Sequence, residues 1–168
     1  MVRKVPPHAA ARGGLSVKEE PRELPDTEKE PAVGIAHARL AQWIENRVTA
    51  FEQLGLAWYA VRLTGSEAII GNCGMLVGRR TSDEPEIGYE IADTEREQGY
   101  ASEAARAVVD ECTVAGINRV WATVRPSNST SLRILESLGF SRAFSEVDER
   151  GTLLHLAKEL GPRTPTAT

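Results

Sequence analysis

A short run of small and polar residues separates a strand-like segment from a helix-like segment near the middle of the chain. The run reads Arg96-Glu97-Gln98-Gly99-Tyr100-Ala101, and Glu86-Ile87-Gly88-Tyr89-Glu90-Ile91 precedes it. The apolar residues that follow recur at helical spacing: Ala101, Ala104, Ala105, Val108, Val109 and Cys112. A helix that begins at such a loop directs its unpaired backbone N–H groups and the positive end of its dipole at the loop. This feature predicts a site for a ligand that carries phosphate.

The composition is that of an ordinary folded protein and argues against several classes of partner. The 168 residues are enough for one domain with a real core, and 41% of them are hydrophobic. The net charge of −4 argues against a broad basic surface for nucleic acid and is compatible with a cationic substrate such as an amine. No apolar run approaches the roughly 18 residues that span a membrane. Prolines follow Arg3 and Lys4 where a secretion signal would be apolar, so we expect a cytoplasmic protein.

The cysteines and histidines predict no metal site. Cys73 and Cys112 are the only cysteines, too few for a disulfide framework or a four-thiolate zinc site. Cys112 continues the apolar stripe of the predicted helix, so we expect it to fill the core. His8, His37 and His155 stand far apart, with no triad partner and no metal-ligand spacing.

Composition also divides the chain into an arm, a domain and a tail. Residues 1–33 are crowded with charged residues and prolines and hold few apolar residues. They bury too little apolar area to offset the entropy of ordering. We therefore expect a flexible or loosely docked arm over 1–33, a folded domain over 34–160 and a tail over 161–168.

Hydrophobic periodicity predicts an α/β fold over the domain. The predicted elements are helices around 41–51 and just after Pro126, and strands at 57–63, 68–77, 86–92, 117–125, 140–147 and 152–158. Strands 86–92 and 117–125 are joined through a helix at 101–115, so these two strands should be parallel. The predicted sheet is mixed and mostly antiparallel, with one parallel pair and flanking helices.

Three motifs, in order and on the expected elements, resemble the GNAT acetyltransferase superfamily. Arg96, Gly99 and Ala101 match that family's cofactor loop, Arg/Gln-x-x-Gly-x-Gly/Ala. The resemblance is closer to the branch that includes ribosomal-protein N-terminal acetyltransferases. The residues that match the branch are Glu86 to Tyr89, Gly99 to Ala104, Asn128, Ser131, Leu135, Gly139 and Phe140. The resemblance covers residues 34–160 and implies a GNAT-like fold, with the parallel strands splayed, and an acetyl-CoA-dependent N-acetyltransferase.

The resemblance also implies how coenzyme A would bind. The pyrophosphate would lie on the backbone N–H groups of Arg96, Glu97, Gln98, Gly99, Tyr100, Ala101 and Ser102. Gly99 allows close backbone approach or a positive φ, and Arg96 can add a charge-assisted contact. Asn128 would contact the pantetheine arm, although an asparagine there can also simply cap a helix. A backbone N–H at Ile91 or Ala92 would donate to the thioester oxygen.

Acyl transfer to an amine further needs a base and a proton donor for the departing thiolate. Glu86 and Glu90 share one face of a regular strand, and we expect at least one of them to act, directly or through water. Family members use a tyrosine as thiolate donor where this chain has Leu135, and the branch uses a serine one turn earlier, here Ser131. Each candidate can also be structural, the glutamates as solvated edge residues and the serine as a local backbone acceptor.

Two departures from the family pattern leave alternatives open. Family members begin with a strand and a helix that cover one sheet edge, and residues 1–33 hold no convincing version of that strand. Either this region folds unusually, a partner chain covers the edge as in a homodimer, or the acceptor site is altered.

The identity of both substrates also stays open. The acceptor would be a protein N-terminus, a polyamine, an amino sugar or an antibiotic, and the acyl group would be acetyl or longer.

The second departure, Leu135, favours a rival function, that of a non-catalytic coenzyme-A-binding module. A third reading, an unrelated nucleotide-binding domain, is disfavoured because the chain has neither a Gly-x-Gly-x-x-Gly fingerprint nor a P-loop.

Overall fold

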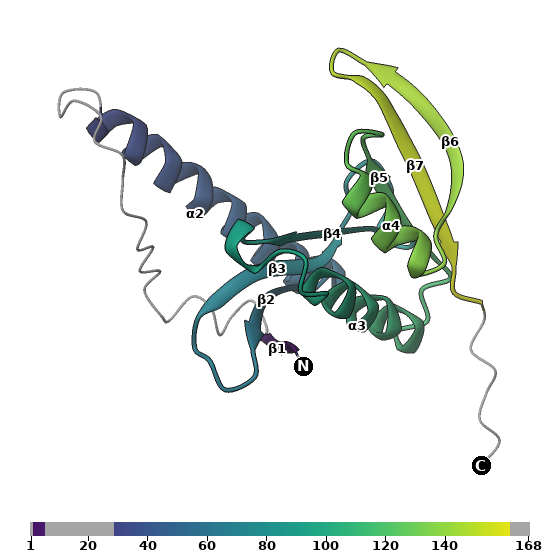
Figure 1. Cartoon of the computed structure of the whole chain (residues 1–168), viewed down its shortest axis with the longest axis horizontal. Coiled ribbons are helices and arrows are strands. Elements are labelled where there is room, and N and C mark those ends of the chain that lie inside the picture. The colour runs from purple at the N-terminus through teal and green to yellow at the C-terminus, as the bar shows by residue number, and fades with distance from the viewer. Residues whose placement is uncertain (1, 6–28, 162–168) are drawn as a thin grey trace.

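A seven-stranded sheet with helices on both faces makes up the described structure (Figure 1). The computed structural model describes residues 2–5 and 29–161. Its strands are β1 (Val2–Val5), β2 (Trp58–Leu63), β3 (Ile69–Leu76), β4 (Glu86–Ile91), β5 (Arg119–Val124), β6 (Ser141–Asp148) and β7 (Gly151–Glu159). Its helices are α2 (Lys29–Leu54), α3 (Tyr100–Val114) and α4 (Ser129–Ser137), with a 3-10 turn η1 (Asp93–Glu95). The predicted α/β fold is confirmed, and its predicted strands lie within a few residues of the observed ones.

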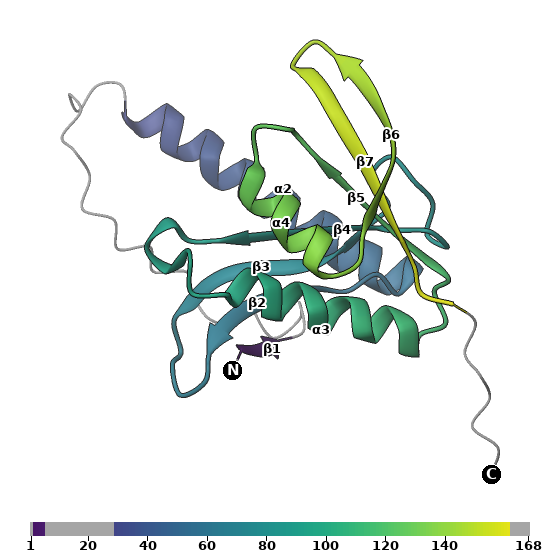
Figure 2. The same ribbon diagram turned by 45° about the vertical axis from the view of Figure 1, so that its right-hand side comes forward.

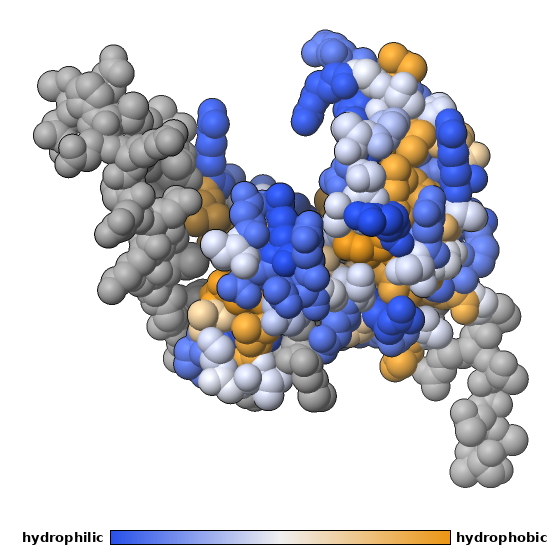
Figure 3. Space-filling view, viewed as in Figure 1, coloured by the Kyte–Doolittle hydropathy of each residue, from blue (hydrophilic) through white to orange (hydrophobic). Residues whose placement is uncertain are grey.

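The sheet contains one parallel pair, as predicted. The strands lie in the order β1-β2-β3-β4-β5-β7-β6, and every neighbouring pair is antiparallel except β4 and β5. The parallel ladder pairs Glu86 with Trp121, and the N–H of Trp121 donates to the carbonyl of Pro85 at 2.9 Å. Toward their C-terminal ends the two strands diverge (Figure 1). The divergence opens a V-shaped gap in the sheet between β4 and β5. The surface is hollowed between the part of the molecule that contains β4 and the part that contains β5 (Figure 3).

The core lies between the sheet and α3. The predicted apolar stripe of this helix is buried, with Ala105 and Val108 at 0% and 2% exposure, and it packs against β3 and β4. Cys112 is 4% exposed, which confirms it as core filler. Burying one valine contributes roughly 1.5–3 kcal/mol, so the stripe fixes α3 firmly to the sheet. The N-terminus of α3 therefore lies near the C-terminal end of β4, where the gap opens.

Helix α2 covers the opposite face of the sheet from α3 (Figure 2). Trp43 on α2 meets Trp58 on β2 edge to face, with ring centroids 5.5 Å apart. The predicted helix at 41–51 is the C-terminal part of α2, and Gly55 follows it with a φ of +70°. Only glycine adopts that left-handed backbone without strain, so Gly55 ends the helix as predicted.

The N-terminal region differs from the prediction. Strand β1 pairs with β2 from Val2 opposite Leu63 to Val5 opposite Ala60, so the expectation that 1–33 hold no such strand was wrong. Four residues are too few to give a clear alternating pattern. Since β1 covers the edge of β2, the argument for a homodimer falls away. The predicted boundary at 33 lies inside α2, and residues 6–28 and 162–168 of the predicted arm and tail lie outside the described residues.

Two further classes of feature are absent from the described part of the chain. None of its helices is long and apolar enough to cross a bilayer. Within residues 2–5 and 29–161, no three His, Cys, Asp or Glu side chains are grouped to hold a metal ion.

Candidate active site

The C-terminal end of β4 presents a backbone N–H group to the V-shaped gap. The N–H of Ala92 donates to the carbonyl of Ile70 on β3 at 2.8 Å, so it points away from β5. Successive N–H groups of a strand point to opposite sides, so the N–H of Ile91 points toward β5 and into the gap. Of the two candidate donors to a thioester oxygen, Ile91 is the one with the suitable direction.

The loop before α3 leaves N–H groups without helical partners. Gly99 is the N-cap, with a φ of +83°, and a Cβ built on it would meet nothing within 4 Å. The first helical hydrogen bond runs from the N–H of Glu103 to the carbonyl of Gly99 at 3.0 Å. The N–H groups of Tyr100, Ala101 and Ser102 therefore have no acceptor inside the helix. With the positive end of the helix dipole behind them, these groups can bind an anion.

The side chains of the same loop are exposed. Arg96 forms an ion pair with Asp93 at 2.6 Å, with 63% of the Arg96 side chain exposed. Exposed ion pairs contribute only roughly 0.2–1 kcal/mol, so Arg96 can exchange Asp93 for a phosphate at little cost. Glu97 and Gln98 are exposed, and Glu97 has a φ of +64°. Any role of Glu97 in anion binding must come from its backbone, because a carboxylate repels an anion, whereas the Gln98 amide can also donate from its side chain.

Helix α4 borders the gap on the side of β5. The side chain of Asn128 accepts a hydrogen bond from the N–H of Ser131 at 3.1 Å and so caps the helix. The hydroxyl of Tyr89 on β4 donates to the backbone carbonyl of Ser131 at 3.4 Å, across the gap. Burial raises the pKa of Tyr89, so its hydroxyl stays protonated at neutral pH. Leu135 is 2% exposed and belongs to the core.

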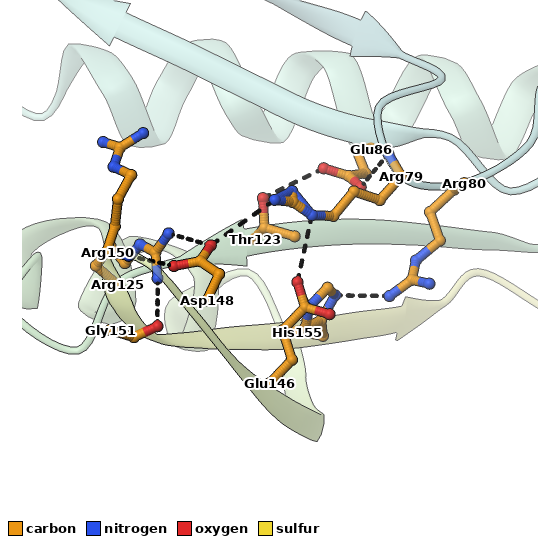
Figure 4. Close-up of polar contacts among 10 residues, drawn as sticks. All are labelled: Arg79, Arg80, Glu86, Thr123, Arg125, Glu146, Asp148, Arg150, Gly151 and His155. Atoms are coloured by element: carbon orange, nitrogen blue, oxygen red, sulfur yellow. Dashed lines mark hydrogen bonds and ion pairs between the residues drawn. The ribbon is translucent and has the colours of Figure 1, made fainter.

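Glu86 is buried, and its carboxylate accepts hydrogen bonds from two neighbouring elements (Figure 4). Its carboxylate accepts a hydrogen bond from the backbone N–H of Arg79 at 2.9 Å and one from the hydroxyl of Thr123 at 3.3 Å. Gly78 passes close by, and a Cβ on it would lie 2.7 Å from the Glu86 carboxyl carbon. These contacts are those of a group that ties the loop after β3 to β4 and β5.

A polar network beside Glu86 joins the same loop to the β6–β7 hairpin (Figure 4). The Arg80 guanidinium donates to Nδ1 of His155 at 2.7 Å and stacks over Trp121 at 4.1 Å. Arg125 forms an ion pair with Asp148 at 2.6 Å, and its hydrogen bond holds the pKa of Asp148 below its usual value. His155 is 1% exposed, so we assign this histidine a structural role in the network.

Glu90 lies in a different environment from Glu86, although the two share a strand face as predicted. The register between β3 and β4 runs without a shift from Gly71–Ile91 to Leu76–Glu86, so no bulge separates the two glutamates. Glu90 is exposed and lines a pocket of about 350 Å³ between α2 and the sheet. This volume is at the lower end of the roughly 300–1,000 Å³ of small-molecule pockets.

The wall of this pocket is largely apolar and aromatic. Trp43 and Trp58 supply its two largest rings. Asn72, which stands opposite Glu90 in the ladder, accepts a hydrogen bond from the Trp58 indole N–H at 3.2 Å. The sequence did not single out Asn72, Arg47 or Tyr89 as site residues. Of these three residues, only Tyr89 could have been identified from the sequence, because it ends the Glu-Ile-Gly-Tyr motif.

Comparison with known sequences places this geometry in a family. A family model of the acetyltransferase (GNAT) domain matches residues 25–141. The uncharacterized N-acetyltransferase p20 of Bacillus licheniformis is 31% identical over 85 residues, 50% of this chain and 48% of p20. The chain spans about half the length of the curated relatives it matches.

Two solved structures share the fold. The ribosomal-protein-S5-alanine acetyltransferase from Vibrio fischeri superposes with a TM-score of 0.63 at 17% identity, covering 74% of this chain and 72% of that one. The yncA protein from Salmonella typhimurium, solved with acetyl-CoA, gives 0.60 at 17% identity, covering 74% of this chain and 78% of that one. Since the family model covers well over half of the sequence and the fold agrees, the chain belongs to the GNAT acetyltransferase family.

Proposed function

We propose that the protein transfers an acetyl group from acetyl-CoA to a primary amine. The observation that carries the proposal is the gap between β4 and β5, with an anion-binding helix N-terminus at its mouth and a pocket containing Glu90 beside β4. Family membership supports the reaction class, and the acetyl-CoA bound to yncA supports the donor. Neither of them identifies the acceptor.

The residues around the gap fit coenzyme A. The N–H groups of Tyr100, Ala101 and Ser102 can hold the pyrophosphate, and the open space beside Gly99 admits it. Arg96 can leave Asp93 to add a charge-assisted contact. Asn128, which is exposed next to the gap, is our candidate for the pantetheine contact. When bound, acetyl-CoA supplies a thioester whose C–S bond breaks as the amine nitrogen bonds to its carbonyl carbon.

The chain's own groups can supply the base, the oxyanion donor and the proton donor that this reaction needs. An amine arrives protonated, and Glu90 can take its proton directly or through water, since its carboxylate is exposed in the pocket. Glu86 is already occupied by Arg79 and Thr123, so we assign the base role to Glu90. The N–H of Ile91 can stabilise the developing oxyanion. The hydroxyls of Ser131 and Tyr89 are the candidates that return a proton to the sulfur.

The rival reading, a non-catalytic coenzyme-A-binding module, has one specific observation in its favour. The tyrosine position of the family is occupied by Leu135, which is buried and has no proton to give. The Tyr89 hydroxyl lies across the same gap and offers a substitute donor. The rival predicts cofactor binding without turnover.

The proposed cofactor site is tested by Ser102→Glu. A glutamate in the first turn of α3 should leave the helix as stable as before or slightly more stable, because it complements the dipole. The same charge should repel the pyrophosphate and lower the affinity for coenzyme A by about tenfold or more. Isothermal calorimetry with acetyl-CoA and with free coenzyme A measures the affinity, and thermal unfolding measures the stability.

Gln53→Glu is the matched control, because it adds the same charge to an exposed position on α2. It should leave the affinity unchanged. Equal affinities in the wild type, Gln53→Glu and Ser102→Glu would mean that phosphate does not bind at the α3 N-terminus.

A further inference from the structure

The pocket contains two side chains of opposite charge that form no ion pair with any side chain the structure describes. Glu90 on β4 and Arg47 on α2 both line it. None of the ion pairs among the described residues includes either of them. Opposite charges that line one cavity without meeting each other can both be satisfied by a ligand that carries both complementary charges.

Aromatic rings hold Arg47 in place, and no ion pair within the described part of the chain includes it. Its guanidinium lies 4.6 Å from the ring centroid of Trp58 and 5.2 Å from that of Trp43. Its Nε is buried and has no hydrogen-bond acceptor among the residues that the structure describes. Burial lowers the pKa of Arg47 from its usual value. A buried guanidinium N–H without an acceptor is unfavourable, so a carboxylate brought by a ligand would gain a charge-assisted contact at this half-buried arginine.

The rest of the wall indicates the body of the ligand. Leu40, Ile44 and Ile69 supply aliphatic surface beside the two tryptophans. The pocket volume of about 350 Å³ fits a compact molecule. Polyamines and simple amino sugars carry no anionic group for Arg47, and the additional cationic groups of a polyamine would be repelled by it.

We propose that the acceptor is a small primary amine that also carries a carboxylate and an apolar side chain, as an apolar amino acid does. The amine would lie at Glu90, the carboxylate at Arg47 and the side chain against the apolar wall. This inference rests on the proposed acetyl transfer and narrows its substrate class.

The test uses three amines of one shape: L-leucine, L-leucinamide and isopentylamine. The full chain is given acetyl-CoA and each amine, with released thiol and N-acetylated product both measured. The kcat/KM for leucine should exceed that for the other two by about tenfold or more, because only leucine has the carboxylate. Arg47→Gln should remove this preference by lowering the value for leucine and leaving that for leucinamide within about threefold. Arg39→Gln, an exposed change on the same helix, is the charge-matched control and should alter nothing.

The outcomes separate this inference from the proposed function. If leucinamide, isopentylamine or a polyamine is acetylated as well as leucine and Arg47→Gln changes nothing, the inference is overturned while acetyl transfer stands. If no amine is acetylated, calorimetry with leucine in the presence of coenzyme A decides. Leucine binding that is lost in Arg47→Gln supports the pocket assignment, and the absence of binding overturns it. A failure to bind acetyl-CoA at all would overturn the proposed function itself.

Discussion

Replacing Glu90 with glutamine should lower kcat by about 100-fold or more at neutral pH, the usual contribution of a general base. Glutamine keeps the shape of the side chain but cannot accept the amine proton. Because Glu90 lies in the pocket and not at the α3 N-terminus, the affinity for coenzyme A should change by less than about threefold. Steady-state rates and calorimetry on the same preparation measure both quantities.

Glu52→Gln provides the control for this experiment. Glu52 is exposed on α2, is not among the pocket residues, and undergoes the same change in charge. Its kcat should match that of the wild type. A Glu90→Gln enzyme that also retains the wild-type kcat would show that the proton leaves by another route.

Glu86→Ala should reduce the free energy of unfolding by about 2–3 kcal/mol. Truncation removes the acceptor for the Arg79 N–H and the Thr123 hydroxyl. A fully buried donor left without a partner costs about 1–3 kcal/mol, and these two donors are half-buried, so we expect the lower part of that range for each. Urea denaturation measures the change from the shift in midpoint at constant slope.

Glu86→Gln separates a structural role from a catalytic one. The amide oxygen can still accept from Arg79, so the loss of stability should stay below about 1 kcal/mol, and kcat should remain near the wild-type value. A stable Glu86→Gln protein whose kcat falls about 100-fold would make Glu86, and not Glu90, the base.

The parts of the fold that the sequence predicts are those with local signals. Small residues predict the loop at 96–101, and an apolar period of 3.6 residues predicts the helix after it. The parallel arrangement of β4 and β5 is predicted because the helix between them forms a crossover connection. Strand β1 has only four residues, and its place depends on pairing with β2, more than fifty positions away. No local pattern specifies such a contact.

The two glutamates show which features the sequence pattern predicts and which depend on tertiary packing. Alternation places Glu86 and Glu90 on one face, and the regular register confirms this. Which of them is buried depends on the loop after β3, where Gly78 and Arg79 fold over Glu86. Arg47 could not be predicted as a pocket residue for the same reason, since its position depends on two tryptophans from different elements.

The most direct test of the central claim is the identification of the reaction product. The protein is incubated with acetyl-CoA and a panel of amino acids, their amides, polyamines and peptides with free N-termini, and the products are identified by mass spectrometry while free thiol is counted. We expect one acetylated amine for each coenzyme A released, with the signal nearly abolished in Glu90→Gln. A protein that binds acetyl-CoA but acetylates no member of the panel would instead be a non-catalytic coenzyme-A-binding module, and the proposed acetyl transfer would be wrong.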